Sequence, residues 1–223
     1  MKRLPNSADF SIEKELCSKG YKIIAGIDEA GRGALAGPLS LAMVIYPSSI
    51  YTDTPELILS TIADSKKLSS KKREESFSVI KNFSLHYTST FVPHTIIDRT
   101  DINTATKIGI EKLLAKSQIK PDIIIMDGNF KFKLDTKFMS VIKGDNISIS
   151  IASASIIAKV LRDELMDKVD LKYPDYGFSI HKGYGTKKHL DSIYAKGFSD
   201  IHRKSYEPIK SLNQKEELLF SED

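Results

Sequence analysis

Two adjacent carboxylates, Asp28 and Glu29, follow an apolar run and precede a glycine-rich turn. The segment 26–38 reads GIDEAGRGALAGP and contains four glycines. Glycine has no Cβ, so backbone amides and carbonyls at these positions can approach a ligand closely. Acidic side chains at the end of a strand, beside such a turn, indicate metal-assisted chemistry at a binding surface lined by backbone.

Two further acids stand at the ends of expected strands. Asp127 precedes Gly128, and Asp145 follows Gly144. Carboxylates from separate strands can converge outside the strand ends of an open sheet. Oxygen donors with no partnering Cys pair favour Mg²⁺ or Mn²⁺, and two such ions about 4 Å apart can activate a water and stabilise the leaving oxygen of a phosphodiester. A single Asp before Gly more often marks a turn or caps a helix. Here acids stand at the ends of three expected strands, and this coincidence favours a functional site.

Other reactive groups carry less weight. Ser153 and Ser155 lie on an expected helix without an evident His–Asp partnership, so a serine hydrolase is not expected. The segment GYGT at 183–186 could cradle a phosphate at the start of the next helix, where Thr186 can act as N-cap, although a plain helix-start turn is the commoner meaning. The glycine spacing of GRGALAG fits neither a P-loop nor a dinucleotide fingerprint.

The composition is ordinary for a soluble globular protein. The 223 residues are 41% hydrophobic and 28% charged, enough for one large domain or one domain with a small appendage. No apolar run is long enough to span a bilayer, and the N-terminus lacks the apolar core of a secretory signal. The lone Cys17 excludes an internal disulfide, fits a reducing cytoplasm and is a weak candidate for thiol catalysis.

Positive charge is concentrated near the C-terminus. Residues 181–210 hold seven Lys/Arg and three acidic residues within a chain of formal charge +4. This distribution favours a nucleic-acid contact, although a solvated helix surface has the same pattern. The histidines of this segment are spaced too irregularly for metal ligands, and we expect surface or phosphate-contact roles for His181, His189 and His202.

Hydrophobic periodicity predicts the elements that position the acids. Strands are expected at 22–28, 39–46, 84–92, 122–128 and 138–142. Helices are expected within 1–20 and at 69–82, 102–117 and 148–168, the last with Arg162 on its polar side. Strands dominate the first half and helices the second, which indicates an α/β core with a helical C-terminal subdomain.

In order and spacing, segments of this chain resemble those of bacterial ribonuclease HII. The matching segments are GIDEAGRGALAGP (26–38), DSKKLS (64–69), MDG (126–128), KGD (143–145), SIASASIIAKVLRDE (150–164), GYGT (183–186) and HRKSYEP (202–208). The resemblance implies an RNase H-like mixed β-sheet flanked by helices, with a C-terminal helical subdomain. It places an N-terminal helix at 1–20, the catalytic core at 21–170, a substrate-binding subdomain at 171–210 and a tail at 211–223.

The resemblance also implies a function and its residues. The family cleaves the RNA strand of RNA–DNA hybrids and single ribonucleotides embedded in duplex DNA, by two-metal-ion hydrolysis with Mg²⁺ or Mn²⁺ that leaves 3′-OH and 5′-phosphate ends. Carried over, Asp28, Glu29, Asp127 and Asp145 bind the metal and are catalytic. The backbone of Gly31, Arg32 and Gly33 contacts the 2′-OH that distinguishes RNA from DNA. Tyr184 stacks on the sugar at the RNA–DNA junction, and Lys66 contacts the substrate.

The sequence departs from the family at Ala34, where proline is usual, and we expect this to loosen the turn slightly. Type HIII enzymes carry an extra N-terminal domain, whereas 25 residues precede the motif here, which favours type HII. Some relatives bind a sliding clamp through an acidic tail such as 216–223, but the spacing from Gln214 does not fit the usual motif. We expect a monomer with no membrane partner.

Two rival functions remain open on the sequence. A non-catalytic protein that binds hybrids on the same fold would need at least one of the four carboxylates replaced. A DNA-directed nuclease or an integrase-like enzyme would lack the turn that contacts the 2′-OH. Cleavage of a duplex with one embedded ribonucleotide, with and without Mg²⁺, discriminates between these alternatives.

Overall fold

The protein is described by a computed structural model for residues 8–62 and 69–219, with side-chain environments up to residue 214. Lys66 and most of its DSKKLS segment lie outside the described residues, as does the end of the tail at 220–223. In the described part, no helix is long and apolar enough to cross a membrane.

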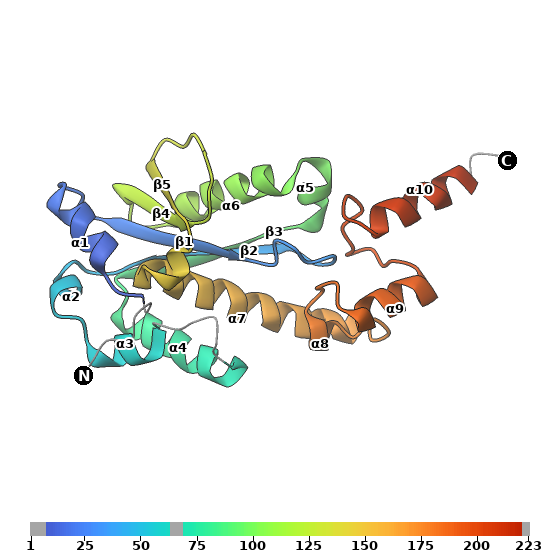
Figure 1. The fold of residues 1–223 in the computed structure, drawn as a ribbon, viewed down its shortest axis with the longest axis horizontal. Helices are drawn as coiled ribbons and strands as arrows, with labels where there is room; N and C mark the ends of the chain where they lie inside the picture. The colour runs from blue at the N-terminus through green and yellow to red at the C-terminus, as the bar shows by residue number, and fades with distance from the viewer. Residues whose placement is uncertain (1–7, 63–68, 220–223) are drawn as a thin grey trace. The chain divides into compact units, whose positions relative to one another are not determined.

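Five strands form one mixed sheet in the order β3-β2-β1-β4-β5 (Figure 1). The strands are β1 (Ile24–Ala30), β2 (Leu39–Ile45), β3 (His86–Val92), β4 (Ile123–Asp127) and β5 (Lys137–Val141). β1 pairs with β4 in parallel, and β4 pairs with β5 in parallel. All seven residues of β2 and the first four of β4 are buried, as expected for central strands covered on both faces.

Helices are the other regular elements of the described structure. They are α1 (Ser11–Ser18), α2 (Ser49–Thr52), α3 (Glu56–Ile62), α4 (Ser70–Phe83), α5 (His94–Arg99), α6 (Ile102–Lys116), the short 3₁₀ turn η2 (Gly144–Asn146), α7 (Ile149–Lys172), α8 (Phe178–His181), α9 (Lys187–Lys196) and α10 (Ile209–Leu219). Figure 1 shows α6 and α7 on either side of the strands.

Glycines allow two helices to pack closely on the sheet. A Cβ at Gly26 in β1 would lie 2.3 Å from the carbonyl carbon of Ser150 in α7, so only glycine fits this crossing. A Cβ at Gly109 in α6 would lie 2.4 Å from Leu41 in β2. The start of α7 is further held by buried Glu13, whose Oε1 accepts hydrogen bonds from the Ser148 hydroxyl and the Ser150 amide. These contacts fix α7 beside β1.

The fold divides into two compact units. The first contains the chain up to Ala30 together with Leu41–Thr90 and Gly109–Val160; the second contains Gly31–Ser40, Phe91–Ile108 and the chain from Leu161 onward. Small apolar clusters organise the second unit: one around Leu35, Ile193 and Ile209, and one around Ala36, Met166 and Phe178. The functional boundaries at residues 20, 170 and 210 stay a prediction.

The periodicity located the main elements well. All five expected strands and the helices at 69–82, 102–117 and 148–168 are present, with ends that differ by a few residues. β1 runs to Ala30, so Asp28 and Glu29 lie inside the strand and not beyond it. The helices α2, α3 and α5 were not expected, whereas α8, α9 and α10 lie in the C-terminal region that the sequence predicted to be helical. The α/β architecture with a helical C-terminal region is confirmed.

Candidate active site

Parallel strand pairing brings the predicted acids to one edge of the first unit. Ile27 of β1 is paired with Met126 of β4, so Asp28 and Asp127 each follow directly after this pair. Asp127 is in turn paired with Val141 of β5. Because the three strands run in the same direction, their carboxyl ends lie together, as the sequence pattern predicted.

A hydrogen bond ties the segment that carries Asp145 to Asp127. The Gly144 amide donates to Asp127 Oδ1 at 2.7 Å. A Cβ at Gly144 would meet Ile151 at 2.6 Å and Val141 at 3.2 Å, which accounts for glycine at this position. Asp145 follows in η2 and is buried. The turn after β5 is therefore anchored on the carboxylate at the end of β4.

Burial and neighbouring charges perturb the carboxyl group of Asp28. It is 6% exposed, and burial raises the pKa of its carboxyl group well above the ordinary value. The neighbouring charges of Glu29 and Asp127 raise this pKa further, while hydrogen bonds from Ser155 and from the Glu29 amide oppose the rise. A buried carboxylate beside two others is an arrangement that a divalent cation would stabilise.

The donor chemistry fits Mg²⁺ or Mn²⁺, since the acids at this edge offer only carboxylate oxygens. Within residues 8–62 and 69–219, no three Asp, Glu, His or Cys side chains are gathered closely enough to form a ready-made metal site. The structure thus brings Asp28, Glu29 and Asp127 into electrostatic contact without assembling a complete ligand set. The metal-binding role of these residues and of Asp145 stays a prediction.

The two serines that sequence analysis considered have structural partners. Ser155 of α7 donates to Asp28, and the Ser153 hydroxyl lies 2.8 Å from the Tyr46 hydroxyl. Ser155 is thus a neighbour of the predicted metal site that sequence analysis did not recognise. Its place on the face of α7 toward Asp28 depends on the close crossing of α7 and β1.

In the second unit, the glycine-rich turn is held by the guanidinium group of Arg203. This side chain is fully buried and donates to the carbonyls of Gly31 at 2.7 Å, Arg32 at 2.9 Å and Gly37 at 3.0 Å. Burial lowers the pKa of Arg203 to about 10, so it stays charged at neutral pH. The sequence placed Arg203 in a basic surface, which is wrong because the side chain is buried and its guanidinium group donates to three backbone carbonyls.

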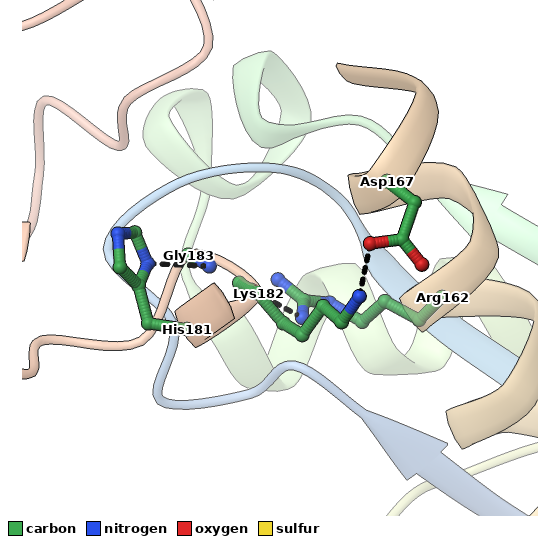
Figure 2. A network of polar contacts seen from close by, with 5 residues as sticks. All are labelled: Arg162, Asp167, His181, Lys182 and Gly183. Atoms are coloured by element: carbon green, nitrogen blue, oxygen red, sulfur yellow. Dashed lines mark hydrogen bonds and ion pairs between the residues drawn. The ribbon is translucent and has the colours of Figure 1, made fainter. Parts of the chain in front are cut away.

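A second buried arginine holds the other end of the turn. Arg162 of α7 donates to the carbonyls of Ala36 and Pro38, each at 3.0 Å. It also donates to the Lys182 carbonyl at 2.7 Å (Figure 2). The sequence placed Arg162 on the polar side of its helix, but the side chain is fully buried. A Cβ at Gly31, whose φ is +91°, would lie 2.0 Å from Arg162 Nε, so this glycine is required by the arginine.

The exposed member of the turn is Gly33. A Cβ added there would meet no atom within 4 Å, and its φ is not in the left-handed region. Neither packing nor backbone conformation therefore demands glycine at this position. Ala34 is buried, and its amide donates to the Gly31 carbonyl at 3.3 Å, a bond that the family's usual proline could not make. This bond opposes the loosening that we expected from alanine.

Tyr184 lies against the same turn within the second unit. Its hydroxyl accepts a hydrogen bond from the Gly31 amide at 3.1 Å, and its backbone forms a β-bridge with Ala34. The Arg162 guanidinium carbon lies 5.3 Å from the centroid of its ring. The Arg32 side chain turns away and donates to Asn103 and Thr106. The second unit thus brings the GRG turn and Tyr184 together.

The segment after Tyr184 begins α9. Thr186 is its N-cap, as the sequence predicted, with its hydroxyl accepting from the His189 amide. Lys187 and Lys188 are exposed in the first turn of this helix. The expectation of surface roles for His181, His189 and His202 is wrong: all three are buried and hydrogen-bonded to one another or to backbone.

Comparison with known proteins decides the family. The model of the family Ribonuclease HII matches residues 25–209. This chain belongs to the ribonuclease HII family. It is similar to the ribonuclease HII of Carboxydothermus hydrogenoformans, with 44% identity over 213 residues that cover 95% of this chain and 89% of the relative. It is also 44% identical to that of Acholeplasma laidlawii over 207 residues, covering 92% and 96%.

Solved structures of the family share the fold. The crystal structure of ribonuclease H2 from Pyrococcus horikoshii OT3 matches with a TM-score of 0.71 and 25% identity, covering 86% of this chain and 98% of that one. The RNase HII of a PCNA:RNase HII complex from Archaeoglobus fulgidus matches with a TM-score of 0.68 and 24% identity, covering 83% and 95%. As a ribonuclease HII, the protein is a metal-dependent endoribonuclease that cleaves RNA in RNA–DNA hybrids.

Proposed function

We propose that this ribonuclease HII also cuts at single ribonucleotides embedded in duplex DNA, leaving 3′-OH and 5′-phosphate ends. The observation that carries the proposal is the parallel register that sets Asp28 beside Asp127, where Asp28 is three residues before Gly31 in the sequence. Chemistry and sugar recognition are thereby linked by a short stretch of chain. The experiment that tests it is cleavage of a duplex with one embedded ribonucleotide.

The four acids, Asp28, Glu29, Asp127 and Asp145, are proposed to hold Mg²⁺ or Mn²⁺. When bound, a pair of such ions supplies water activation and stabilisation of the leaving oxygen at the scissile phosphate. Buried Asp28 contributes negative charge in a region of low dielectric, where attraction to a cation is strong. Ser155 holds the Asp28 carboxylate in place, and the Gly144 amide does the same for Asp127.

The backbone of Gly31, Arg32 and Gly33 is proposed to contact the ribose 2′-OH. Support comes from the two buried arginines, whose hydrogen bonds hold the carbonyls of this turn in one conformation. A turn that is already ordered loses less entropy when a substrate binds. Gly33 supports the same proposal because its exposed face is open to an approaching sugar.

Gly33→Ala should weaken recognition without destabilising the fold. The added methyl group meets no atom of the chain, so the melting temperature should change little. It would stand where the sugar approaches, and we expect KM for a single-ribonucleotide duplex to rise by about tenfold. Thermal melting and steady-state kinetics check this, and an unchanged KM would place the sugar away from Gly33.

Tyr184 is proposed to stack on the sugar at the RNA–DNA junction. Tyr184→Ala should lower cleavage at a single embedded ribonucleotide more than cleavage in an all-RNA strand, because the all-RNA strand offers alternative registers. The loss at the single ribonucleotide should be on the order of 1–3 kcal/mol, by analogy with aromatic stacking on bases. Side-by-side kinetics measure it, with Tyr194→Ala, an exposed tyrosine of α9, as a control. Equal losses on both substrates would leave Tyr184 with only a structural role.

The exposed lysines at the start of α9 are proposed to contact phosphates. Lys187→Ala plus Lys188→Ala should weaken binding to hybrid and to plain DNA alike, and should flatten the salt dependence of log K by roughly one to two units. The matched control is Lys71→Ala plus Lys72→Ala, which removes the same charge from exposed positions in α4. Binding titrations over a range of salt concentrations check this. If both double variants keep the wild-type slope, the start of α9 does not contact the duplex.

A further inference from the structure

Three buried histidines of the second unit pack around the turn that carries Tyr184. The rings of His181 and His189 are stacked, with centroids 4.2 Å apart and an interplanar angle of 16°. His202 packs against His189 with ring centroids 5.2 Å apart. Phe178 closes the apolar side through edge contacts with the first two rings. Neither the predicted metal site nor the basic surface uses these side chains.

Hydrogen bonds assign one tautomer to His202 and one to His189. His202 Nδ1 accepts from the Ser199 amide at 2.9 Å, so its proton is on Nε2. This Nε2–H faces His189 Nε2 at 3.0 Å and donates to it. His189 Nδ1 lies 3.0 Å from the carbonyl oxygen of Tyr184, which can only accept, so Nδ1 carries the second proton. The result is one directed chain, Ser199 to His202 to His189 to the Tyr184 carbonyl, which we call the histidine chain.

His181 holds the residues just before Tyr184. Its Nε2–H donates to the Tyr176 carbonyl at 2.8 Å, and its Nδ1 accepts from the Gly183 amide at 3.2 Å (Figure 2). Lys182, which lies between His181 and Gly183, has a φ of 52° in the left-handed region. Figure 2 shows how this conformation is held, with Arg162 bound to the Lys182 carbonyl and Asp167 paired with its ammonium group.

We propose that His189 and His202 are positioning residues that orient Tyr184 for the single-ribonucleotide junction. The inference rests on the role proposed above for Tyr184. The Tyr184 amide donates to the His181 carbonyl at 2.9 Å, its carbonyl accepts from His189, and its hydroxyl accepts from Gly31. The Tyr184 carbonyl also accepts from the Thr186 amide at 2.8 Å, and the histidine chain supplies its one side-chain contact in the described structure. Loss of that contact would leave the peptide after Tyr184 less restrained and allow the ring to shift.

The hydrogen bonds of the histidine chain require both imidazoles to be neutral. A second proton on His202 would face the Ser199 amide, and one on His189 would face the Nε2–H of His202, so each would set two donors against each other. Burial, together with the nearby histidines, lowers the pKa of His189 and of His202 to about 4. Both rings are therefore neutral at the pH of a standard nuclease assay.

A matched pair of substitutions isolates the contact with Tyr184. His189→Asn places an amide nitrogen near the position of Nδ1 and can still donate to the Tyr184 carbonyl, whereas His189→Gln places its polar atoms near Nε2 and cannot. The readout is the ratio of kcat/KM on a single-ribonucleotide duplex to that on an all-RNA strand. We expect His189→Gln to lower this ratio roughly fivefold to tenfold, the effect of one lost buried hydrogen bond, and His189→Asn to hold it within about twofold.

Tyr184→Ala, measured in parallel, separates this inference from the function on which it rests. In the Tyr184→Ala background, His189→Gln should not lower the ratio further. If Tyr184→Ala lowers the ratio and His189→Gln does not, the positioning role is overturned while the role of Tyr184 stands. If Tyr184→Ala leaves the ratio unchanged, the role of Tyr184 and the inference fall together.

A spectroscopic measurement tests the histidine chain directly. It needs neither an activity assay nor substituted variants. Long-range ¹H–¹⁵N correlation spectra of the wild-type protein at pH 7 distinguish the two neutral tautomers and the cation for each imidazole. We expect the proton on Nδ1 in His189 and on Nε2 in His202 and His181. A proton on Nε2 of His189, or a cationic ring at either His189 or His202, would contradict the proposed direction of the histidine chain.

Discussion

Asp28→Asn should reduce turnover by about a thousandfold or more while leaving hybrid affinity nearly unchanged. Asparagine keeps the shape of the side chain but removes the negative charge that the proposed cation needs. Affinity should persist because basic residues and backbone contacts supply it. Asp127→Asn should behave in the same way, since its carboxylate lies beside Asp28 and raises the pKa of that group.

The measurement is single-turnover cleavage in Mg²⁺ combined with equilibrium binding to a hybrid duplex. Asp135→Asn is the matched control, because it removes one carboxylate at an exposed position before β5. We expect wild-type turnover in the control. Near-wild-type cleavage by Asp28→Asn or by Asp127→Asn would remove that residue from the metal site.

Arg203→Met should strongly destabilise the second unit. It deletes four hydrogen bonds to three carbonyls, and two of these bonds go to the carbonyl of Gly37. Leaving buried polar groups unpaired costs about 1–3 kcal/mol each, so we expect a loss of about 3 kcal/mol. For a chain of this length this corresponds to a fall of roughly 6–12 °C in melting temperature.

Thermal melting checks this prediction. Lys204→Met is the control, because it removes a cation at the neighbouring, exposed position. Arg203→Lys adds a second comparison: it keeps the charge, but a single ammonium group cannot reach all the carbonyls that the planar guanidinium spans. We expect Arg203→Lys to melt well below wild type. A melting temperature equal to that of Lys204→Met would show that the turn does not depend on Arg203.

The arrangement of the acids could be predicted because its causes are local. Apolar runs predict the strands, parallel strands share an edge for their carboxyl ends, and the acids follow the runs directly. The structure pairs Ile27 with Met126 and so sets Asp28 beside Asp127, as that reasoning requires. The type and approximate bounds of these strands needed no information beyond the sequence.

The buried arginines and histidines could not be predicted in this way. Arg162 and Arg203 are bound by backbone carbonyls from distant parts of the chain, and carbonyls leave no mark on a sequence. A guanidinium group is ordinarily a surface group, so charge counts place it outside the core. The burial of the three histidines could not be predicted for the same reason. Their partners are backbone groups and one another, and only the tertiary fold brings these together.

The helices α2, α3 and α5 were missed for a different reason. They are short or polar segments whose positions depend on packing, and short helices have little intrinsic stability. Asp98 of α5 illustrates this, since its carboxylate accepts from the amides of Lys204 and Ser205 in a distant segment. Such a contact positions α5 but has no counterpart in local periodicity.

The most direct test of the central claim is gel mapping of cleavage in a DNA duplex that carries one embedded ribonucleotide. We expect a single Mg²⁺-dependent cut at the ribonucleotide that leaves 3′-OH and 5′-phosphate ends, no cut in the all-DNA duplex, and no cut by Asp28→Asn. Cleavage of the all-DNA duplex at a similar rate, or undiminished cleavage of the ribonucleotide duplex by Asp28→Asn, would contradict the central claim.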